Sequence, residues 1–199
     1  MIPNGVDIDF FAPSANPPPI TIVVYIGRFR PEKRCELLLQ AWQQVQSSHP
    51  KAHLTLVGGA GLTPRYEQIA ANLKIEPAFV PTASAEEVRD YLQRNSIFVL
   101  PGVSEGMSNA LLEAMSVGLA PVVSNVGGNL TLVSPEVNGL CYDKDSPDEL
   151  VAPLRRLLDD VSLRERLGSA ARQTILHQYS LDSIVDQYLA LYKRIINEA

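Results

Sequence analysis

The 199-residue sequence has few cysteines, no long apolar run and no excess of positive charge. Cys35 and Cys141 are too few for a disulfide framework, so we expect two small packed side chains in a reducing compartment. The longest purely apolar run, Ile22–Ile26, is far shorter than the ~20 residues that span a bilayer. A net charge of −5 argues against nucleic acid or an anionic membrane as partner. These absences predict a cytoplasmic globular protein without a transmembrane segment.

Several familiar site motifs are also absent. The sequence has no Gly-x-Ser-x-Gly nucleophile elbow and no Walker phosphate loop. Pro50 separates His49 from His53, and no cysteine or acid completes a zinc set around them. The glycine-rich segment 58–61 has Pro64 where the dinucleotide fingerprint needs its third glycine, so we expect a tight turn there. The sequence predicts neither a metal site nor a nicotinamide or flavin site.

Short apolar runs alternate with stretches of helical periodicity along most of the chain. The runs begin roughly 20 to 33 residues apart, which leaves room for one helix between successive strands. Because the runs are continuously apolar, we expect strands buried on both faces, as in a parallel sheet covered by helices. The sequence therefore predicts a doubly wound, Rossmann-like α/β fold. The predicted strands are Ile20–Ile26, His53–Val57, Ala78–Val80, Ile97–Leu100 and Pro121–Ser124.

After about residue 143 the pattern predicts helices alone. Residues 146–149, Ser-Pro-Asp-Glu, have the composition of a helix start, with serine at the cap and acids in the first turn. We expect a second helix over Leu163–Leu176 and a last one from Leu181 to Ile195, capped by Ser180. The apolar stripe of this last helix is wider than one sheet face requires, so we expect it to contact something beyond this domain.

Basic residues and glycines gather where the predicted strands end, which is where ligands bind in an open α/β sheet. Arg28 and Lys33 follow the first strand, and glycine-containing loops follow the fourth and fifth strands. A guanidinium and an ammonium beside a strand end suit a diphosphate. The alternative is a solvated loop in which the two cations pair with Glu32 and Glu36.

The segment 104–115 is the most informative. Ser108 or Asn109 can cap a helix whose first N–H groups and positive dipole end form an anion site. Glu105 precedes that helix and Glu113 lies within it, on the order of 10 Å away along the axis. This separation fits carboxylates that bind the sugar and the ribose of a nucleotide sugar, and exceeds the ~5 Å of a retaining glycosidase pair. The alternative is two solvated charges, although an unpartnered acid in an apolar helix is costly.

Five motifs occur in an order that resembles a known family. They are Gly27-Arg28-Phe29-x-Pro31-Glu32-Lys33, Leu56-Val57-Gly58, Phe98-Val99-Leu100-Pro101, the Glu-x7-Glu segment 105–115, and Gly127-Gly128. Together they resemble the C-terminal, donor-binding domain of retaining glycosyltransferases of the two-domain GT-B fold, family 4 (group 1 glycosyltransferases). The resemblance covers essentially the whole chain. Arg34 and Pro81 stand where this family usually has glycine, and Thr131 stands where an acid is common.

The resemblance implies a role for each matching residue. Arg28 and Lys33 would hold the donor diphosphate and stabilise the charge on the departing nucleotide, and Glu105 would contact the transferred sugar. These three are the implied catalytic residues. Glu113 would hold the ribose hydroxyls, and the base would lie near Val80. The implied donor-binding residues are Gly27, Val80, Pro81, Gly106, Met107, Ser108, Asn109 and Glu113.

The resemblance also implies an activity and a partner. The family transfers a hexose from a nucleotide-diphosphate sugar with retention at the anomeric carbon, without metal or cofactor. An N-terminal domain binds the acceptor. We therefore expect residues 1–19 to be an interdomain hinge, residues 20–178 a nucleotide-sugar-binding domain, and residues 179–199 a helix that crosses to the N-terminal domain. The isolated chain would be inactive, and any membrane contact would be made by that other domain.

Three other interpretations remain open. The chain could be a stand-alone nucleotide-sugar-binding module without catalysis, or a GT-B relative that epimerises or phosphorolyses sugars. An α/β protein-interaction domain is the third, but it leaves the cluster Arg28, Lys33, Glu105 and Glu113 unexplained.

Overall fold

The computed structural model describes residues 2–15, 22–143 and 146–198. Its centre is an all-parallel, six-stranded sheet in the order β3-β2-β1-β4-β5-β6. The strands are β1 (Ile22–Ile26), β2 (His53–Val57), β3 (Ala78–Val80), β4 (Ile97–Leu100), β5 (Ala120–Ser124) and β6 (Leu140–Tyr142). All five predicted strands are present, although residues 20–21 of the first prediction lie outside the described residues.

The sixth strand, β6, is the element that the sequence pattern did not indicate. Its three residues pair with β5, Leu140 opposite Val122 and Tyr142 opposite Ser124. Three residues carry too little periodicity to predict a strand, and the edge of β5 is what makes this segment extended. The prediction of five strands was therefore one strand short.

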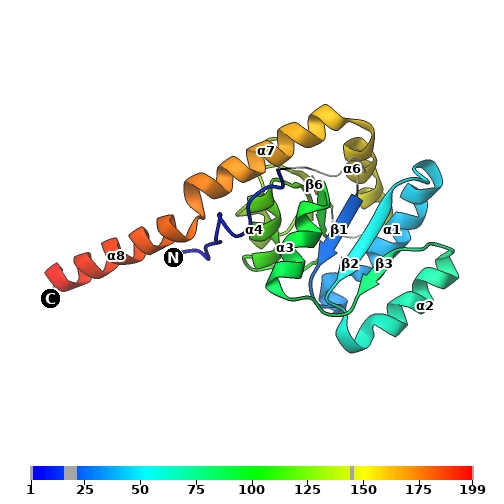
Figure 1. Ribbon diagram of the computed structural model, residues 1–199, viewed down its shortest axis with the longest axis horizontal. Coiled ribbons are helices and arrows are strands. Elements are labelled where there is room, and N and C mark those ends of the chain that lie inside the picture. Colours follow the sequence, from blue (N-terminus) through cyan, green and yellow to red (C-terminus); the bar gives the residue numbers. More distant parts are fainter. Residues whose placement is uncertain (1, 16–21, 144–145, 199) are drawn as a thin grey trace.

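Two layers of helices cover the sheet, as predicted (Figure 1). α1 packs against α2 and α6, whereas α4 packs against α3 and α7. The helices are α1 (Cys35–Ser48), α2 (Thr63–Leu73), α3 (Ala85–Gln93), α4 (Asn109–Val117), α5 (Gly127–Leu130), α6 (Pro147–Asp159), α7 (Val161–Gln178) and α8 (Leu181–Glu198), with short 3-10 turns η1 (Pro31–Lys33) and η2 (Ala60–Leu62). This arrangement is the doubly wound, Rossmann-like α/β fold.

The core lies between these layers and the sheet. Strands β4 and β5 are buried along their whole length, which explains their continuous apolar sequence. Trp42 of α1 and Phe98 of β4 are among the largest fully buried side chains. One side of α1 faces this core, since Leu38, Ala41 and Val45 are also fully buried. Burial of these faces, rather than helix propensity, fixes the positions of the helices.

The predicted C-terminal helices are present with longer bounds. The amide of Asp148 donates to Ser146 Oγ at 3.2 Å, which confirms the cap of α6. α7 begins two residues before the predicted start, because Asp160 caps it through the amide of Leu163. Ser180 caps α8 as predicted, and α8 continues beyond Ile195 to Glu198. The helix starts were therefore predictable from cap residues, and the ends less so.

The N-terminal segment lies against the beginning of α8. Val6 exchanges backbone hydrogen bonds with Tyr179 and Leu181, and Arg172 of α7 donates to carbonyl oxygens of Ile8 and Phe11. Beyond this contact α8 extends away from the body of the molecule (Figure 1). Its exposed apolar side chains are Leu181, Val185, Tyr188, Leu189, Tyr192, Ile195 and Ile196. Within the described ranges, no helix has the length and apolarity that a membrane crossing requires.

Candidate functional site

The candidate site lies at the carboxyl ends of β1 and β4. These two strands are neighbours, but the chain continues from them toward opposite edges of the sheet. Such a reversal of strand order opens the crevice in which ligands bind in doubly wound folds. The loop after β1 and the loop after β4 meet there, and the amide of Val103 donates to the carbonyl of Glu32 at 2.9 Å. The fold therefore brings together the two loops that carry the predicted catalytic residues.

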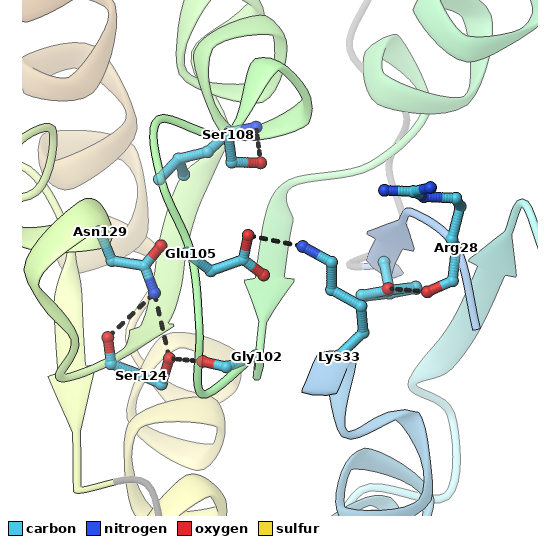
Figure 2. Close-up of polar contacts among 9 residues, drawn as sticks. Arg28, Lys33, Gly102, Glu105, Ser108, Ser124 and Asn129 are labelled. Atoms are coloured by element: carbon cyan, nitrogen blue, oxygen red, sulfur yellow. Dashed lines mark hydrogen bonds and ion pairs between the residues drawn. The ribbon is translucent and has the colours of Figure 1, made fainter. Parts of the chain in front are cut away.

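The backbone of the loop after β1 is fixed from beneath by Tyr25. The Tyr25 hydroxyl donates to the Arg28 carbonyl at 3.0 Å, and burial raises the pKa of Tyr25 far above its usual value, so the hydroxyl remains a donor. A Cβ at Gly27 would lie 2.7 Å from that hydroxyl oxygen, so this position requires glycine. The Arg28 side chain is exposed and has no ion-pair partner among the described residues (Figure 2).

Lys33 ends η1 and points to the opposite loop. Its ammonium lies 2.6 Å from Glu105 Oε2, although the two residues are 72 positions apart in sequence (Figure 2). Neither of the carboxylates considered in the alternative interpretation takes this place, since Glu36 pairs with Arg65 at 3.5 Å. The structure therefore joins two of the three predicted catalytic residues in one ion pair.

Arg34 has a left-handed backbone conformation, which glycine adopts most easily. Its φ of 51° is in the left-handed region, which costs about 1–2 kcal/mol for a residue with a side chain. This single residue ends η1 and caps α1, so it turns the chain between Lys33 and the helix. The chain accepts the strain without a change of fold.

Glu105 is held in a confined space. Its side chain is only 4% exposed, and Oε2 pairs with Lys33. Oε1 is buried and has no hydrogen-bond partner among the described residues. A Cβ at Gly102 would overlap Oε1, so glycine at this position leaves the room that the carboxylate occupies. A carboxylate with one oxygen paired and the other unsatisfied has capacity for one further donor, such as a hydroxyl group.

The N-terminus of α4 lies next to Glu105 (Figure 2). Ser108 caps the helix, since its Oγ accepts from the amide of Leu111 at 3.3 Å. Asn109 Oδ1 accepts from Nδ2 of Asn4 at 3.0 Å, so the N-terminal segment also contacts this helix start. A Cβ at Gly106 would meet nothing within 4 Å, and Met107 is half-buried. The loop is open at Gly106, where a ligand can approach the positive end of the helix.

Glu113 is the second carboxylate of the predicted pair. It lies in α4 between buried neighbours, and burial raises the pKa of its carboxyl to about 7. No hydrogen bond to it occurs within the part of the chain that the structure describes. Glu113 is therefore a partly buried acid without a hydrogen-bond partner among the described residues.

In the sheet, β3 lies two strands away from β1. This strand ends at Val80, and Pro81 follows directly. Their carbonyls accept from the amides of Gly58 and Ala60 at 2.8 and 2.7 Å. The segment 58–61 is thus the predicted tight turn, with Gly58 at a φ of 105°. At ~4.8 Å between strands, the end of β3 lies about 10 Å from the end of β1. A ligand that contacts both positions has to be elongated.

A polar pair missed at the sequence level lies behind Glu105. Asn129 and Ser124 are fully buried, and Asn129 Nδ2 donates to the Ser124 carbonyl and Oγ, each at 3.0 Å. The Ser124 hydroxyl donates in turn to the Gly102 carbonyl. The available signal was a serine at the end of an otherwise apolar strand, followed by an asparagine after two glycines.

Comparison with known proteins agrees with this geometry. The family model described as glycosyl transferases group 1 matches residues 7–174, so the chain belongs to the group 1 glycosyltransferase family. It resembles the sucrose-phosphate synthase of Thermosynechococcus elongatus over 100% of its length, with a TM-score of 0.90 and 27% identity, and covers 53% of that chain. It also resembles the C-terminal domain of a group 1 glycosyl transferase from Francisella tularensis, with a TM-score of 0.78, 19% identity and coverage of 89% and 100% of the two chains.

A curated relative points in the same direction. The chain is 27% identical over 206 residues to an Escherichia coli UDP-Gal:alpha-D-GlcNAc-diphosphoundecaprenol alpha-1,3-galactosyltransferase. The aligned residues cover 96% of this chain and 53% of the relative. The chain spans about half the length of the curated relatives that it matches. Its fold is that of the C-terminal domain of a GT-B glycosyltransferase.

Proposed function

We propose that the chain is the donor-binding domain of a metal-independent, retaining glycosyltransferase that transfers a hexose from a nucleotide-diphosphate sugar to an acceptor. The observation that carries the proposal is the pair of Lys33 and Glu105 at the crevice between β1 and β4, with Arg28 exposed beside it. A cation and a carboxylate at this place match the diphosphate and the hydroxyl-rich sugar of one ligand.

Arg28 and Lys33 bind the diphosphate in this proposal. Arg28 offers a planar fork of donors to two phosphate oxygens, and Lys33 offers a mobile point charge. As the bond from the anomeric carbon to the phosphate oxygen breaks, negative charge grows on the departing diphosphate. Arg28, Lys33 and the N-terminus of α4 stabilise this charge, which is the task that a metal ion performs in other enzymes. This is the physical reason for proposing a reaction without a metal.

The two carboxylates bind the sugar and the ribose of the donor, and the end of β3 binds the base. Glu105, whose carboxylate lies at the crevice with Lys33, accepts from hydroxyls of the sugar, and Glu113 accepts from the ribose. The backbone amides of residues 106–108 assist at the sugar. The base lies near Val80 and Pro81. The distance of about 10 Å between the ends of β1 and β3 suits the extended length of a nucleotide diphosphate.

The acceptor site belongs to a second domain in this proposal. The relatives are about twice as long as this chain, and α8 presents an apolar face outside the body of the domain. We assign residues 1–19 as the hinge, residues 20–178 as the donor domain and residues 179–199 as the helix that packs on the acceptor domain. The donor domain alone then binds nucleotide sugar but transfers nothing. The proposal places the protein in the cytoplasm.

Ligand-induced stabilisation tests the donor site. Thermal unfolding of the intact protein is measured with UDP, GDP, ADP and CMP at millimolar concentration. A ligand at ~100 times its Kd stabilises the fold by about 2.7 kcal/mol. We expect one nucleoside diphosphate to stabilise the protein, and Arg28→Ala and Glu113→Ala to abolish the effect. Arg30→Ala, which removes another exposed cation of the same loop, is the matched control and should retain it. A protein that folds but responds to none of these ligands would refute the proposal.

Transfer itself requires a separate assay. A protein that also contains the acceptor domain is incubated with the nucleotide sugar and acceptor, and the product is examined by proton NMR. An unchanged anomeric configuration supports retention, and an inverted one contradicts it. Binding without transfer favours the stand-alone module. Epimerised sugar or sugar phosphate favours the epimerase or phosphorylase alternative.

A further inference from the structure

A buried polar network connects the end of β5 to the loop that carries Glu105 (Figure 2). It begins at Asn129 in α5, whose amide nitrogen donates to the carbonyl and hydroxyl oxygens of Ser124. The Ser124 hydroxyl then donates to the carbonyl of Gly102, directly after β4. Asn129 and Ser124 have no exposed surface. The end of β5 and the adjacent α5 are thus fixed by polar contacts in the interior to the loop after β4, 22 positions earlier in the sequence.

The backbone of α5 also contacts the Glu105 loop directly. A Cβ at Gly128 would overlap the carbonyl oxygens of Glu105 and Gly106. On its other side the loop is joined to η1, through the amide of Val103 and the carbonyl of Glu32. The loop is therefore enclosed between α5 and η1, and its position depends on where the turn of Gly128 and Asn129 lies.

The side-chain amide of Asn129 also has an unsatisfied hydrogen-bond acceptor. Its Oδ1 is buried and has no hydrogen-bond partner among the described residues. Figure 2 shows the amide nitrogen turned to Ser124 and the oxygen on the side of the Glu105 loop. A buried amide with an unsatisfied oxygen stabilises the fold less than an apolar side chain of the same size would. Stability alone therefore does not explain why asparagine stands at position 129. A role in fixing the adjacent loop does account for it.

We infer that Asn129 is a positioning residue that acts through Ser124 and Gly102 to place the Glu105 carboxylate against the transferred sugar. This inference rests on the proposed function. Lys33 and Arg28 are attached to the opposite loop, so a shift of Glu105 acts directly on the sugar contact and reaches the diphosphate only through the pair of Lys33 and Glu105 and through the start of α4. A substitution that breaks this network should therefore reduce the binding free energy that the sugar contributes.

The test measures two affinities by calorimetry on the intact protein. The ratio of the Kd of the nucleoside diphosphate to that of its hexose ester combines the sugar contact with the lost charge of the terminal phosphate, so the change of this ratio between variants reports the sugar contact. The pairs are UDP with UDP-galactose and UDP-glucose, and GDP with GDP-mannose. For Asn129→Asp, which replaces the donating nitrogen by oxygen, we expect this ratio to fall about tenfold while the diphosphate Kd stays within about twofold. Hydrogen exchange at residues 102–107 should also become faster.

Asn138→Asp is the matched control. Asn138 is another buried asparagine, and its Nδ2 donates to Leu132 O and Thr174 Oγ1, each at 3.0 Å, in the turn before β6. We expect Asn138→Asp to lose about as much thermal stability as Asn129→Asp. The Kd ratio and the hydrogen exchange of residues 102–107 should stay at their wild-type values. If Asn129→Asp does not fold, Ser124→Ala removes the hydroxyl that accepts from Asn129 and donates to Gly102, and leaves the bond from Asn129 to the Ser124 carbonyl; the same loss of ratio is expected.

Three outcomes overturn the inference. A variant of Asn129 or Ser124 that keeps the wild-type ratio shows that the network does not position Glu105. An equal loss in both affinities shows a purely structural role. A ratio that Glu105→Gln leaves at the wild-type value shows that Glu105 has no sugar contact to be positioned. The proposed function fails in a different way, since the wild-type protein would then bind none of the diphosphates.

Discussion

Glu113→Gln should stabilise the ligand-free protein and weaken its donor site at the same time. Burial raises the pKa of the Glu113 carboxyl from its usual 4.5 to about 7. A carboxyl whose folded-state pKa lies above its unfolded-state pKa takes up a proton on folding between these two values. Its contribution to the free energy of unfolding therefore becomes less favourable as the pH rises from about 4.5 to about 7, and stays at its least favourable above that pH. Glutamine carries no charge and avoids this penalty.

The size of the effect follows from the same two values. A pKa near 7 against 4.5 corresponds to about 3 kcal/mol of folding free energy at pH 8. For a chain of this length that is a rise of roughly 6 to 12 °C in Tm. At pH 4 both forms are neutral in both states, so the difference between Glu113→Gln and wild type should shrink to nearly zero.

Urea unfolding between pH 4 and pH 8 measures this difference. Glu67→Gln, at an exposed position of α2, is the matched control and should change stability by less than about 0.5 kcal/mol at every pH. In the presence of the stabilising diphosphate the difference at pH 8 should shrink, because glutamine cannot accept two ribose hydrogen bonds as strongly as a carboxylate. A Glu113→Gln effect that is constant between pH 4 and pH 8 would refute the reasoning from desolvation.

Three further predictions concern the loops and α8. Glu105→Gln frees Lys33, so calorimetry should show tighter binding of the nucleoside diphosphate and a smaller gain from the sugar; weaker binding of both ligands contradicts this. Gly128→Ala should lower the free energy of unfolding in urea by at least about 2 kcal/mol, because its Cβ overlaps two carbonyl oxygens, whereas Gly61→Ala, with open space around it, should not. Tyr192→Asp, at a position 56% exposed, should leave the stability of this chain within about 0.5 kcal/mol but reduce transfer by the protein that includes the acceptor domain. A large loss of stability would show that Tyr192 packs within the chain.

The fold could be predicted because its signals are local. Continuous apolar runs identified β4 and β5 as strands buried on both faces, and cap residues such as Ser146 and Ser180 identified helix starts. β6 was missed because it is extended only through its pairing with β5. The start of α7 was missed because its cap is Asp160, and the ends of α7 and α8 lie a few residues beyond the predicted ones because no glycine or proline marks them.

The places of the candidate site residues in the fold were predictable, and the contacts among them were less so. Knowledge that ligands bind at strand ends was enough to select Arg28, Lys33, Glu105 and the start of α4. The cost of an acid in an apolar helix was enough to select Glu113, and its raised pKa has that cause. Sequence could not choose between Glu32, Glu36 and Glu105 as the partner of Lys33, because nearness in sequence favoured the first two.

The sequence by itself determined the order of strands and helices and the chemistry of each loop, since apolar periodicity, cap residues and glycines act over a few neighbouring positions. Tertiary structure alone decided which loops meet. The reversal of strand order at β1 and β4 brings Lys33 to Glu105 across 72 positions, and the pairing of β5 with β4 places Ser124 and Asn129 behind the same carboxylate. Contacts of this kind depend on the packing of whole elements, and no short segment of the chain contains the information that selects them.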